Sequence, residues 1–163
     1  MNGLDHIYEI ILEAVEKLPE IQVVLSIGTN IDPDRLEPIP PGTVIVRRAP
    51  QVALLKRAAL CITHAGLNTT LESLAQGVPM VAIPIAFDQP GIAARIGHHG
   101  AGEFVDLDNL SADRLWELIR KVLTNRSYAE RAHYFKEVIA KTRGLDIAAD
   151  VIEQALHKAS TKK

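Results

Sequence analysis

ALCITHAGLNTTLESLAQGVPMVAI, residues 59–83, contains two apolar runs separated by a segment with helical spacing. The first run, residues 59–63, predicts a buried strand, and residues 68–76 predict a helix that ends at Gly77 before Pro79. Residues 80–83 predict the next strand. A strand, a helix and a strand joined by such short connections form a right-handed unit with parallel strands. This stretch therefore predicts an α/β fold.

The same alternation continues on both sides of this stretch. Apolar, β-branched runs predict strands at residues 21–27, 43–46 and 103–105, and apolar positions at helical spacing predict helices at residues 4–18, 50–57, 89–98, 111–123, 127–141 and 145–158. Residues 30–42 contain four prolines and predict a loop. We expect a doubly wound parallel sheet, with the last two helices packing back over it. Because the chain opens on a helix where such a fold normally starts with a strand, we also expect a first strand to be missing.

Composition limits the classes of protein to be considered. The chain has 163 residues, of which 47% are hydrophobic, which suits a single domain. A formal net charge of −2 without a large basic cluster argues against a nucleic-acid partner. No apolar run is long enough to cross a membrane, and one cysteine cannot form an internal disulfide. We expect a soluble protein of a reducing compartment, with the cytoplasm as the default.

Polar residues gather where the strand at 59–63 is followed by a helix. The segment contains His64, Gly66, Asn68, Thr69 and Glu72. In parallel sheets this edge binds ligands, because the next helix presents unpaired N–H groups and the positive end of its dipole. A glycine allows close approach of a phosphate, and the side chains add hydrogen-bond donors. The same spacing also fits a simple helix start, with Asn68 or Thr69 as the cap and Glu72 completing a capping box. Local chemistry leaves both interpretations open.

A longer sequence pattern favours the ligand-site interpretation over the capping interpretation. Residues 48–96, RAPQVALLKRAALCITHAGLNTTLESLAQGVPMVAIPIAFDQPGIAARI, resemble the nucleotide-sugar signature of the UDP-glycosyltransferase family. The shared features are Pro-Gln, then Thr-His-x-Gly-x-Asn-Thr-x-x-Glu, then Gly-Val-Pro, then Asp-Gln. The sequence of these residues is most similar to the bacterial macrolide-type and zeaxanthin glucosyltransferase branch. The resemblance implies a Rossmann-like C-terminal half of the two-domain GT-B fold.

The resemblance also implies a role for each matching residue. The residues expected at the diphosphate are His64, Gly66, Asn68 and Thr69, with Glu72 on the ribose, Gln51 near base and ribose, Arg48 stacked on the base, and Asp88 and Gln89 on the sugar. A carboxylate suits a vicinal diol, and an Asp beside a Gln offers sugar hydroxyls both acceptor and donor. Asp88 and Gln89 could also cap the next helix. In an empty site, we expect Thr69 and Glu72 to cap their own helix.

The resemblance further implies an inverting transfer of a hexose, with UDP-glucose as the expected donor and no metal or other cofactor. We expect residues 1–163 to form a single donor-binding domain, with no catalytic residue in this chain. The catalytic base and the acceptor pocket would belong to an N-terminal domain that is absent, so we expect the chain to be inactive alone. The alternatives are a donor-binding subunit of a two-chain glycosyltransferase and an epimerase-like domain acting on sugar nucleotides.

Three other features have simpler interpretations. Asp32-Pro33-Asp34 and residues 106–108, Asp-Leu-Asp, repeat the spacing of a metal clamp, but turn formation explains both. Cys61 lies in an apolar run and is predicted to be core. Trp116 shares a helical face with leucines and an isoleucine and is predicted to pack.

Overall fold

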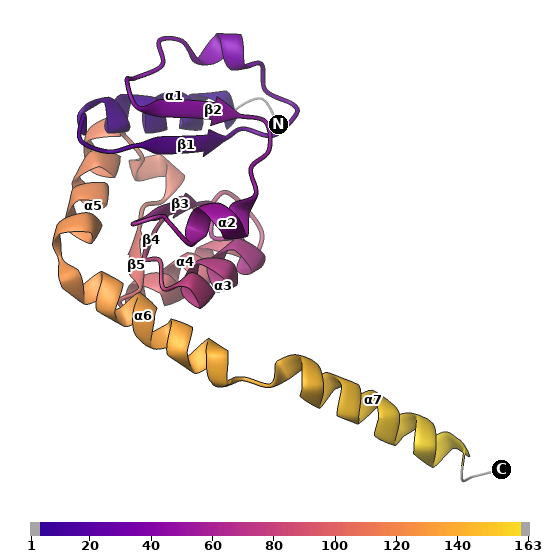
Figure 1. Cartoon of the computed structure of the whole chain (residues 1–163). Coiled ribbons are helices and arrows are strands. Elements are labelled where there is room, and N and C mark those ends of the chain that lie inside the picture. The colour runs from indigo at the N-terminus through magenta and orange to yellow at the C-terminus, as the bar shows by residue number, and fades with distance from the viewer. Residues whose placement is uncertain (1–3, 161–163) are drawn as a thin grey trace.

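The computed structural model describes residues 4–160 and has the predicted order of helices and strands (Figure 1). The strands are β1 (Val23–Ser26), β2 (Thr43–Val46), β3 (Cys61–Thr63), β4 (Met80–Ala82) and β5 (Gly102–Phe104). The helices are α1 (Leu4–Glu16), α2 (Gln51–Leu55), α3 (Leu67–Gln76), α4 (Gln89–His98), α5 (Ala112–Thr124), α6 (Arg126–Lys141) and α7 (Gly144–Ser160), with short 3-10 helices at η1 (Pro33–Leu36) and η2 (Leu107–Asn109). The predicted α/β class is confirmed, and most boundaries agree within two or three residues.

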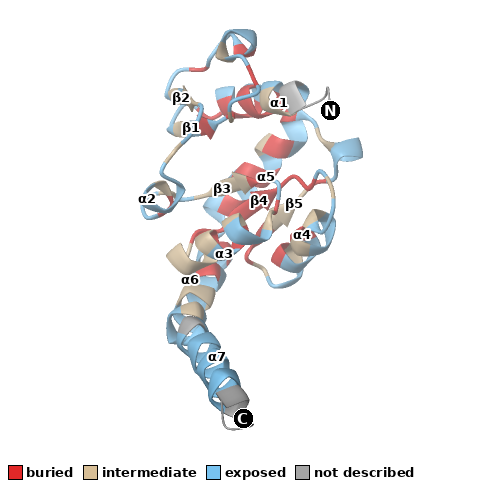
Figure 2. Cartoon of the chain, turned by 90° about the vertical axis from the view of Figure 1, so that its right-hand side faces the viewer, coloured by how far each residue is buried: buried red, intermediate tan, exposed pale blue. Residues whose placement is uncertain are grey.

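The strands form two separate ladders in the described chain. β1 pairs in parallel with β2, and β3, β4 and β5 pair in parallel in that order. The views from two sides place β1, not β2, on the side of the three-stranded sheet (Figures 1 and 2). No hydrogen-bonded ladder joins β1 to β3 in the described residues, so the two sheets are separated at this point.

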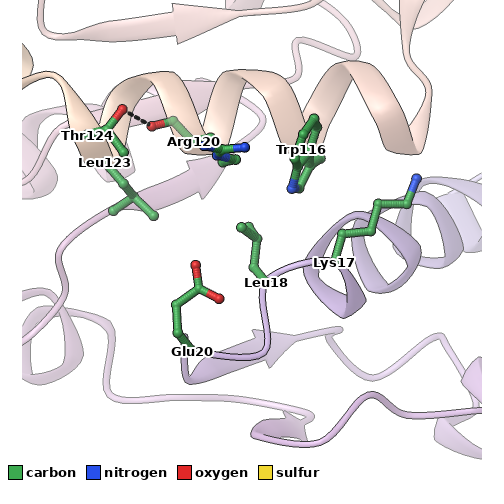
Figure 3. Close-up of a pocket in the computed structure, with 7 residues that line it drawn as sticks. All are labelled: Lys17, Leu18, Glu20, Trp116, Arg120, Leu123 and Thr124. Carbon is green, nitrogen blue, oxygen red and sulfur yellow. Dashed lines mark hydrogen bonds between the residues drawn. The ribbon is translucent and has the colours of Figure 1, made fainter.

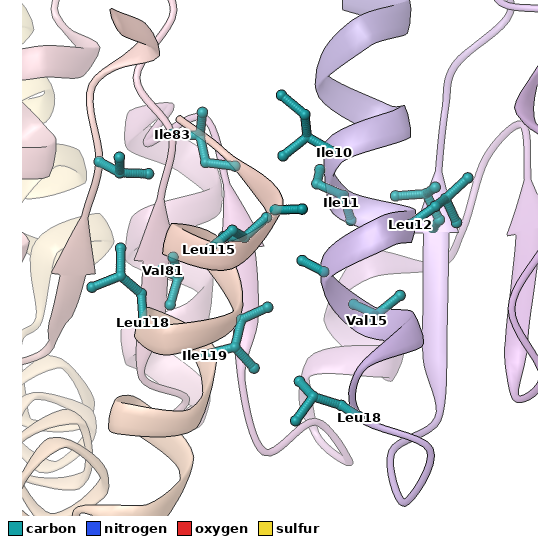
Figure 4. Packing of buried hydrophobic residues seen from close by; sticks show 14 of the residues in the cluster. Ile10, Ile11, Leu12, Val15, Leu18, Val81, Ile83, Leu115, Leu118 and Ile119 are labelled. Carbon is teal, nitrogen blue, oxygen red and sulfur yellow. The ribbon is translucent and has the colours of Figure 1, made fainter. Parts of the chain in front are cut away.

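One hydrophobic cluster lies under both sheets and holds them together. It includes Leu25 and Ile27 at β1, Val81 and Ile83 at β4, and much of α1 and α5. The two helices lie side by side, with Val15 of α1 facing the side chains of α5 (Figure 4). Burial of this apolar surface, rather than a continuous ladder of hydrogen bonds, therefore joins the two halves of the fold.

A second cluster covers the opposite face of the three-stranded sheet. Met80 and Ala82 point into it, whereas Val81, between them in β4, points into the first cluster. On this face the strand packs against Ala93 and Ile96 of α4. Successive residues of a strand point to opposite faces, so β4 is buried on both sides. This arrangement confirms the doubly wound prediction.

The last two helices have different environments. α6 packs against α3 and buries Tyr128 and Ala132. α7 instead extends away from the domain, and its apolar side chains are largely exposed (Figures 1 and 2), namely Ile147, Val151, Ile152 and Leu156. The prediction that both helices pack over the sheet is therefore wrong for α7. The extended backbone of Thr142, φ −76° and ψ 129°, ends α6 and separates the two helices.

A polar bridge joins β5 to the helices behind it. The Glu103 carboxylate accepts hydrogen bonds from Lys121 Nζ on α5, at 2.6 Å, and from the Tyr128 hydroxyl on α6. Partial burial raises the pKa of the Glu103 carboxyl, but the two hydrogen bonds outweigh it, and the pKa is lowered. The bridge fixes the start of α6 and thereby the helix that supports α3.

The two acidic pairs, Trp116 and Cys61 have the simple roles that the sequence predicts. Asp32 and Asp106 each precede a 3-10 helix, and Asp32 accepts a hydrogen bond from the backbone of Asp34, so both acidic pairs lie in turns. Trp116 packs against the first cluster, and Cys61 against the second. Among residues 4–160, none of the helices is long and apolar enough to cross a membrane.

Candidate functional site

The expected site residues lie on loops that leave neighbouring strands at the same edge. β3 and β4 are paired in register, with Thr63 opposite Ala82. The backbone N–H of Ile83 then donates to the Thr63 carbonyl at 2.8 Å, so the two chains separate only beyond this point. The loop after β3 carries His64, and the loop after β4 carries Asp88. These are the carboxyl ends of parallel strands, where α/β sheets bind their ligands.

The turn from β3 into α3 has a strained backbone. Ala65 has a φ of +62°, in the left-handed region that side chains other than glycine rarely adopt. Its N–H donates to the buried Thr63 Oγ1 at 3.2 Å, and its side chain is fully buried. Such strain persists only where surrounding packing enforces it, and it is frequent at ligand sites. Sequence reasoning missed this feature, because Ala carries no turn signal.

The His64 side chain lies directly against Gly66. A Cβ on Gly66 would lie 2.6 Å from His64 Nε2, so the imidazole lies directly against this glycine. Gly66 has a φ of −62° and a ψ of 137°, which any residue can adopt. The reason for the glycine is therefore space for the imidazole, in addition to the close backbone approach that the sequence predicted.

A hollow of about 360 Å³ lies at the start of α3. Its lining residues are His64, Gly66, Leu67, Asn68 and Thr69. The first hydrogen bond of the helix runs from the N–H of Thr70 to the carbonyl of Gly66, so the preceding N–H groups have no partner within the helix. Four of the predicted phosphate residues thus line one hollow beside the positive end of a helix dipole.

Glu72 does not cap α3. Gly66 occupies the N-cap position without a side-chain cap, which places Thr69 inside the first turn. Instead, Gln51 Nε2 of α2 donates to Glu72 Oε2 at 2.6 Å and to Thr69 Oγ1 at 3.2 Å. The predicted capping box, including capping by Asn68, is therefore wrong. The helix begins two residues earlier than Thr69, and the carboxylate turns sideways toward α2.

The loop after β4 is held by Gln89. Its Oε1 accepts hydrogen bonds from the backbone N–H groups of Ile85 and Ala86, at 2.8 and 2.9 Å. Asp88 occupies the N-cap position of α4, but its side chain makes no cap hydrogen bond, so the predicted capping by Asp88 is wrong. Asp88 is exposed, and the Gln89 amide keeps its two donor hydrogens for another partner.

Some of the expected site residues are in direct contact in the structure, and others are not. Gln51, Thr69 and Glu72 are in direct contact, and His64 and Gly66 lie on the same turn. Arg48 is exposed between β2 and α2.

A second hollow, of about 240 Å³, lies between the end of α1 and α5 (Figure 3). Its lining contains none of the expected site residues, and it consists of Lys17, Leu18, Glu20, Trp116, Arg120, Leu123 and Thr124. The Arg120 guanidinium lies over the Trp116 ring, 5.0 Å from its centre. Because β1 begins shortly after Glu20, this hollow lies by the amino ends of the strands, away from the loops of the candidate site.

Comparison with known proteins identifies the family of the chain. The family model described as UDP-glucoronosyl and UDP-glucosyl transferase matches residues 4–154. The chain belongs to this family. It is 39% identical to an uncharacterized UDP-glucosyltransferase, YojK, of Bacillus subtilis (strain 168), over 83% of the chain and 33% of the relative. It is also 39% identical to a zeaxanthin glucosyltransferase of Pantoea ananas, over 70% of the chain and 26% of that protein.

Solved structures of glycosyltransferases share the fold. The crystal structure of the kitacinnamycin glycosyltransferase matches with a TM-score of 0.83 and 33% identity, over 90% of this chain and 38% of the other. The resemblance in sequence to this family is thereby confirmed. The chain spans only 33% to 40% of the length of the first curated relatives it matches.

Proposed function

We propose that this chain is the nucleotide-sugar-binding domain of an inverting glycosyltransferase, one that transfers a hexose from UDP-glucose to an acceptor hydroxyl. The observation that carries the proposal is the convergence at one sheet edge of the His64–Gly66 turn and the cluster of Gln51, Thr69 and Glu72. Membership of the UDP-glucoronosyl and UDP-glucosyl transferase family supports a donor nucleotide at this edge. The exposed carboxylate of Asp88, unused by its helix, supports a sugar contact.

Each residue has a proposed role that its chemistry allows. His64, Asn68, Thr69 and the unpaired N–H groups of α3 bind the diphosphate, and Gly66 provides room. Glu72 accepts hydrogen bonds from the ribose diol, and Gln51 orients that carboxylate through the 2.6 Å contact. Arg48 lies beside the base. The hexose hydroxyls contact Asp88 and the free donor hydrogens of Gln89.

The proposed reaction is a single displacement at the anomeric carbon. A base outside this chain takes the proton of the acceptor hydroxyl, whose oxygen forms the new bond to the anomeric carbon. The bond to the diphosphate oxygen breaks, and that oxygen keeps the electron pair. Donors fixed at the start of α3 stabilise the negative charge that develops there. The configuration at carbon inverts, and no metal or other cofactor takes part.

The acceptor pocket and the base belong to a partner unit, either another domain of the same polypeptide or a separate chain. The short coverage of the relatives supports such a unit. We therefore expect the 163-residue chain to bind the donor without turning it over. The single cysteine and the absence of a spanning helix among the described residues are compatible with a cytoplasmic reaction.

Titration calorimetry of the chain with UDP, UDP-glucose and the corresponding TDP compounds tests the proposal. We expect binding of UDP and UDP-glucose, weakened roughly 5–30-fold by His64→Ala or Glu72→Ala, because each removes a hydrogen bond to a charged or polar ligand group. His157→Ala on α7 and Glu130→Ala on α6 are matched controls at exposed positions and should bind as the parent does. The proposal fails if no nucleotide binds, or if the site variants and the controls behave alike.

A further inference from the structure

Phe87 is an aromatic residue displayed at the edge of the candidate site. Its side chain is 92% exposed, more than any other large hydrophobic residue of the described chain. It lies in the loop between β4 and α4, directly before Asp88. No packing within the described domain accounts for a ring in this position.

The backbone at Phe87 is also strained. Its φ of +59° lies in the left-handed region, where a bulky side chain is an outlier. The two hydrogen bonds that Gln89 accepts from Ile85 and Ala86 hold the preceding residues of the loop. Glycine would suit this backbone better than phenylalanine. The position thus pairs an exposed aromatic ring with a backbone conformation that is unfavourable for phenylalanine, and strained residues of this kind cluster at functional sites.

The neighbouring chemistry indicates what the ring contacts. Asp88 and Gln89 follow immediately and offer polar groups to sugar hydroxyls under the proposed function, on which this step rests. A hexose also has an apolar face of C–H groups, and binding sites combine a few polar groups with an aromatic surface for such faces. We propose that Phe87 is a specificity-determining residue that stacks on the apolar face of the donor sugar.

The inference predicts a difference between UDP and UDP-glucose that calorimetry on the 163-residue chain can measure. Phe87→Gly removes the ring and relieves the left-handed strain, so the loop keeps its backbone. We expect UDP to bind this variant within twofold of the parent, while the dissociation constant for UDP-glucose rises about tenfold, because the buried apolar contact is lost. Phe87→Trp retains an aromatic face and should restore most of the UDP-glucose affinity.

Two controls separate this effect from a change in folding. Tyr134→Ala removes a half-exposed aromatic from α6 and should leave both affinities unchanged. The melting temperature of Phe87→Gly should equal or exceed that of the parent. The inference is overturned if Phe87→Gly binds UDP-glucose as the parent does, if it weakens UDP equally, or if the parent gains nothing from the sugar. Failure of the parent to bind any nucleotide would overturn the proposed function together with this inference.

Discussion

Replacing Gly66 with alanine tests whether the glycine acts through His64. The backbone angles at Gly66 suit alanine, so the substitution introduces no backbone strain. The new Cβ would lie 2.6 Å from His64 Nε2, about 0.8 Å short of the 3.4 Å at which ordinary contact begins, so the imidazole must move. A side-chain end can move cheaply. Alanine is a poorer N-cap than glycine, and we expect a stability loss below about 1 kcal/mol.

The effect on ligand binding should be larger than the effect on stability. Under the proposed function, displacing the imidazole would remove one hydrogen bond to the diphosphate, worth about 1–2 kcal/mol, or roughly 5–30-fold in affinity. His64→Ala forfeits the same bond by deletion. We therefore expect the double variant Gly66→Ala/His64→Ala to bind UDP about as His64→Ala does, because the second change has nothing left to displace.

The assay is calorimetric titration of UDP into the parent, the two single variants and the double variant, with thermal unfolding of each as a check on folding. Additive losses in the double variant would refute the reasoning, since Gly66 would then act on the ligand directly and not through the imidazole. A single variant Gly66→Ala with parental affinity would also refute it.

The remaining predictions concern stability and are read from denaturant unfolding. Gly102→Ala should lower the free energy of unfolding by about 3 kcal/mol or more, because its Cβ would lie 2.0 Å from the Met80 carbonyl oxygen in the paired strand. Gly91→Ala is the control, because a Cβ there would meet open space, and its stability should equal or exceed that of the parent. Equal losses in the two variants would contradict the packing argument. Glu103→Gln should flatten the fall in stability at acid pH. The lowered pKa of Glu103 means that the unfolded chain binds more protons, so the bridge stabilises above the ordinary carboxyl value of about 4.3 and is lost as pH falls through the lowered folded value. Unchanged unfolding profiles between about pH 5 and 3 would contradict this.

The sequence predicted the elements of the fold well because they follow from periodic burial. β4 shows this clearly: its apolar residues face two different clusters, and a short continuous apolar run predicts such a strand whatever it packs against. The exposed position of α7 could not be predicted in the same way. Its apolar stripe has the period of a packed helix, but the pattern says only that a face is apolar, not that a partner is present.

The sequence predicted that the candidate residues lie near one another, but it did not predict the contacts between them. The family resemblance named Gln51, Thr69 and Glu72, yet the local spacing suggested a capping box. The structure places Gly66 at the N-cap, three residues before Thr69, and the Glu72 carboxylate contacts Gln51 and not the backbone. Phe87 was missed because an exposed aromatic in a loop has no sequence signal apart from its place before Asp88.

The break between the two ladders has a consequence for the behaviour of the isolated chain. The backbone N–H groups of Val23 and Ile27 donate to Gly42 and Val46 on the β2 side, so the N–H of the alternate residue Val24 points to the opposite edge of β1. β3 ends the other sheet with a second unpaired edge. Open strand edges are templates on which any extended polypeptide can add. The unpaired edges of β1 and β3 in the described chain are therefore the places where we expect an extended segment of another chain to pair.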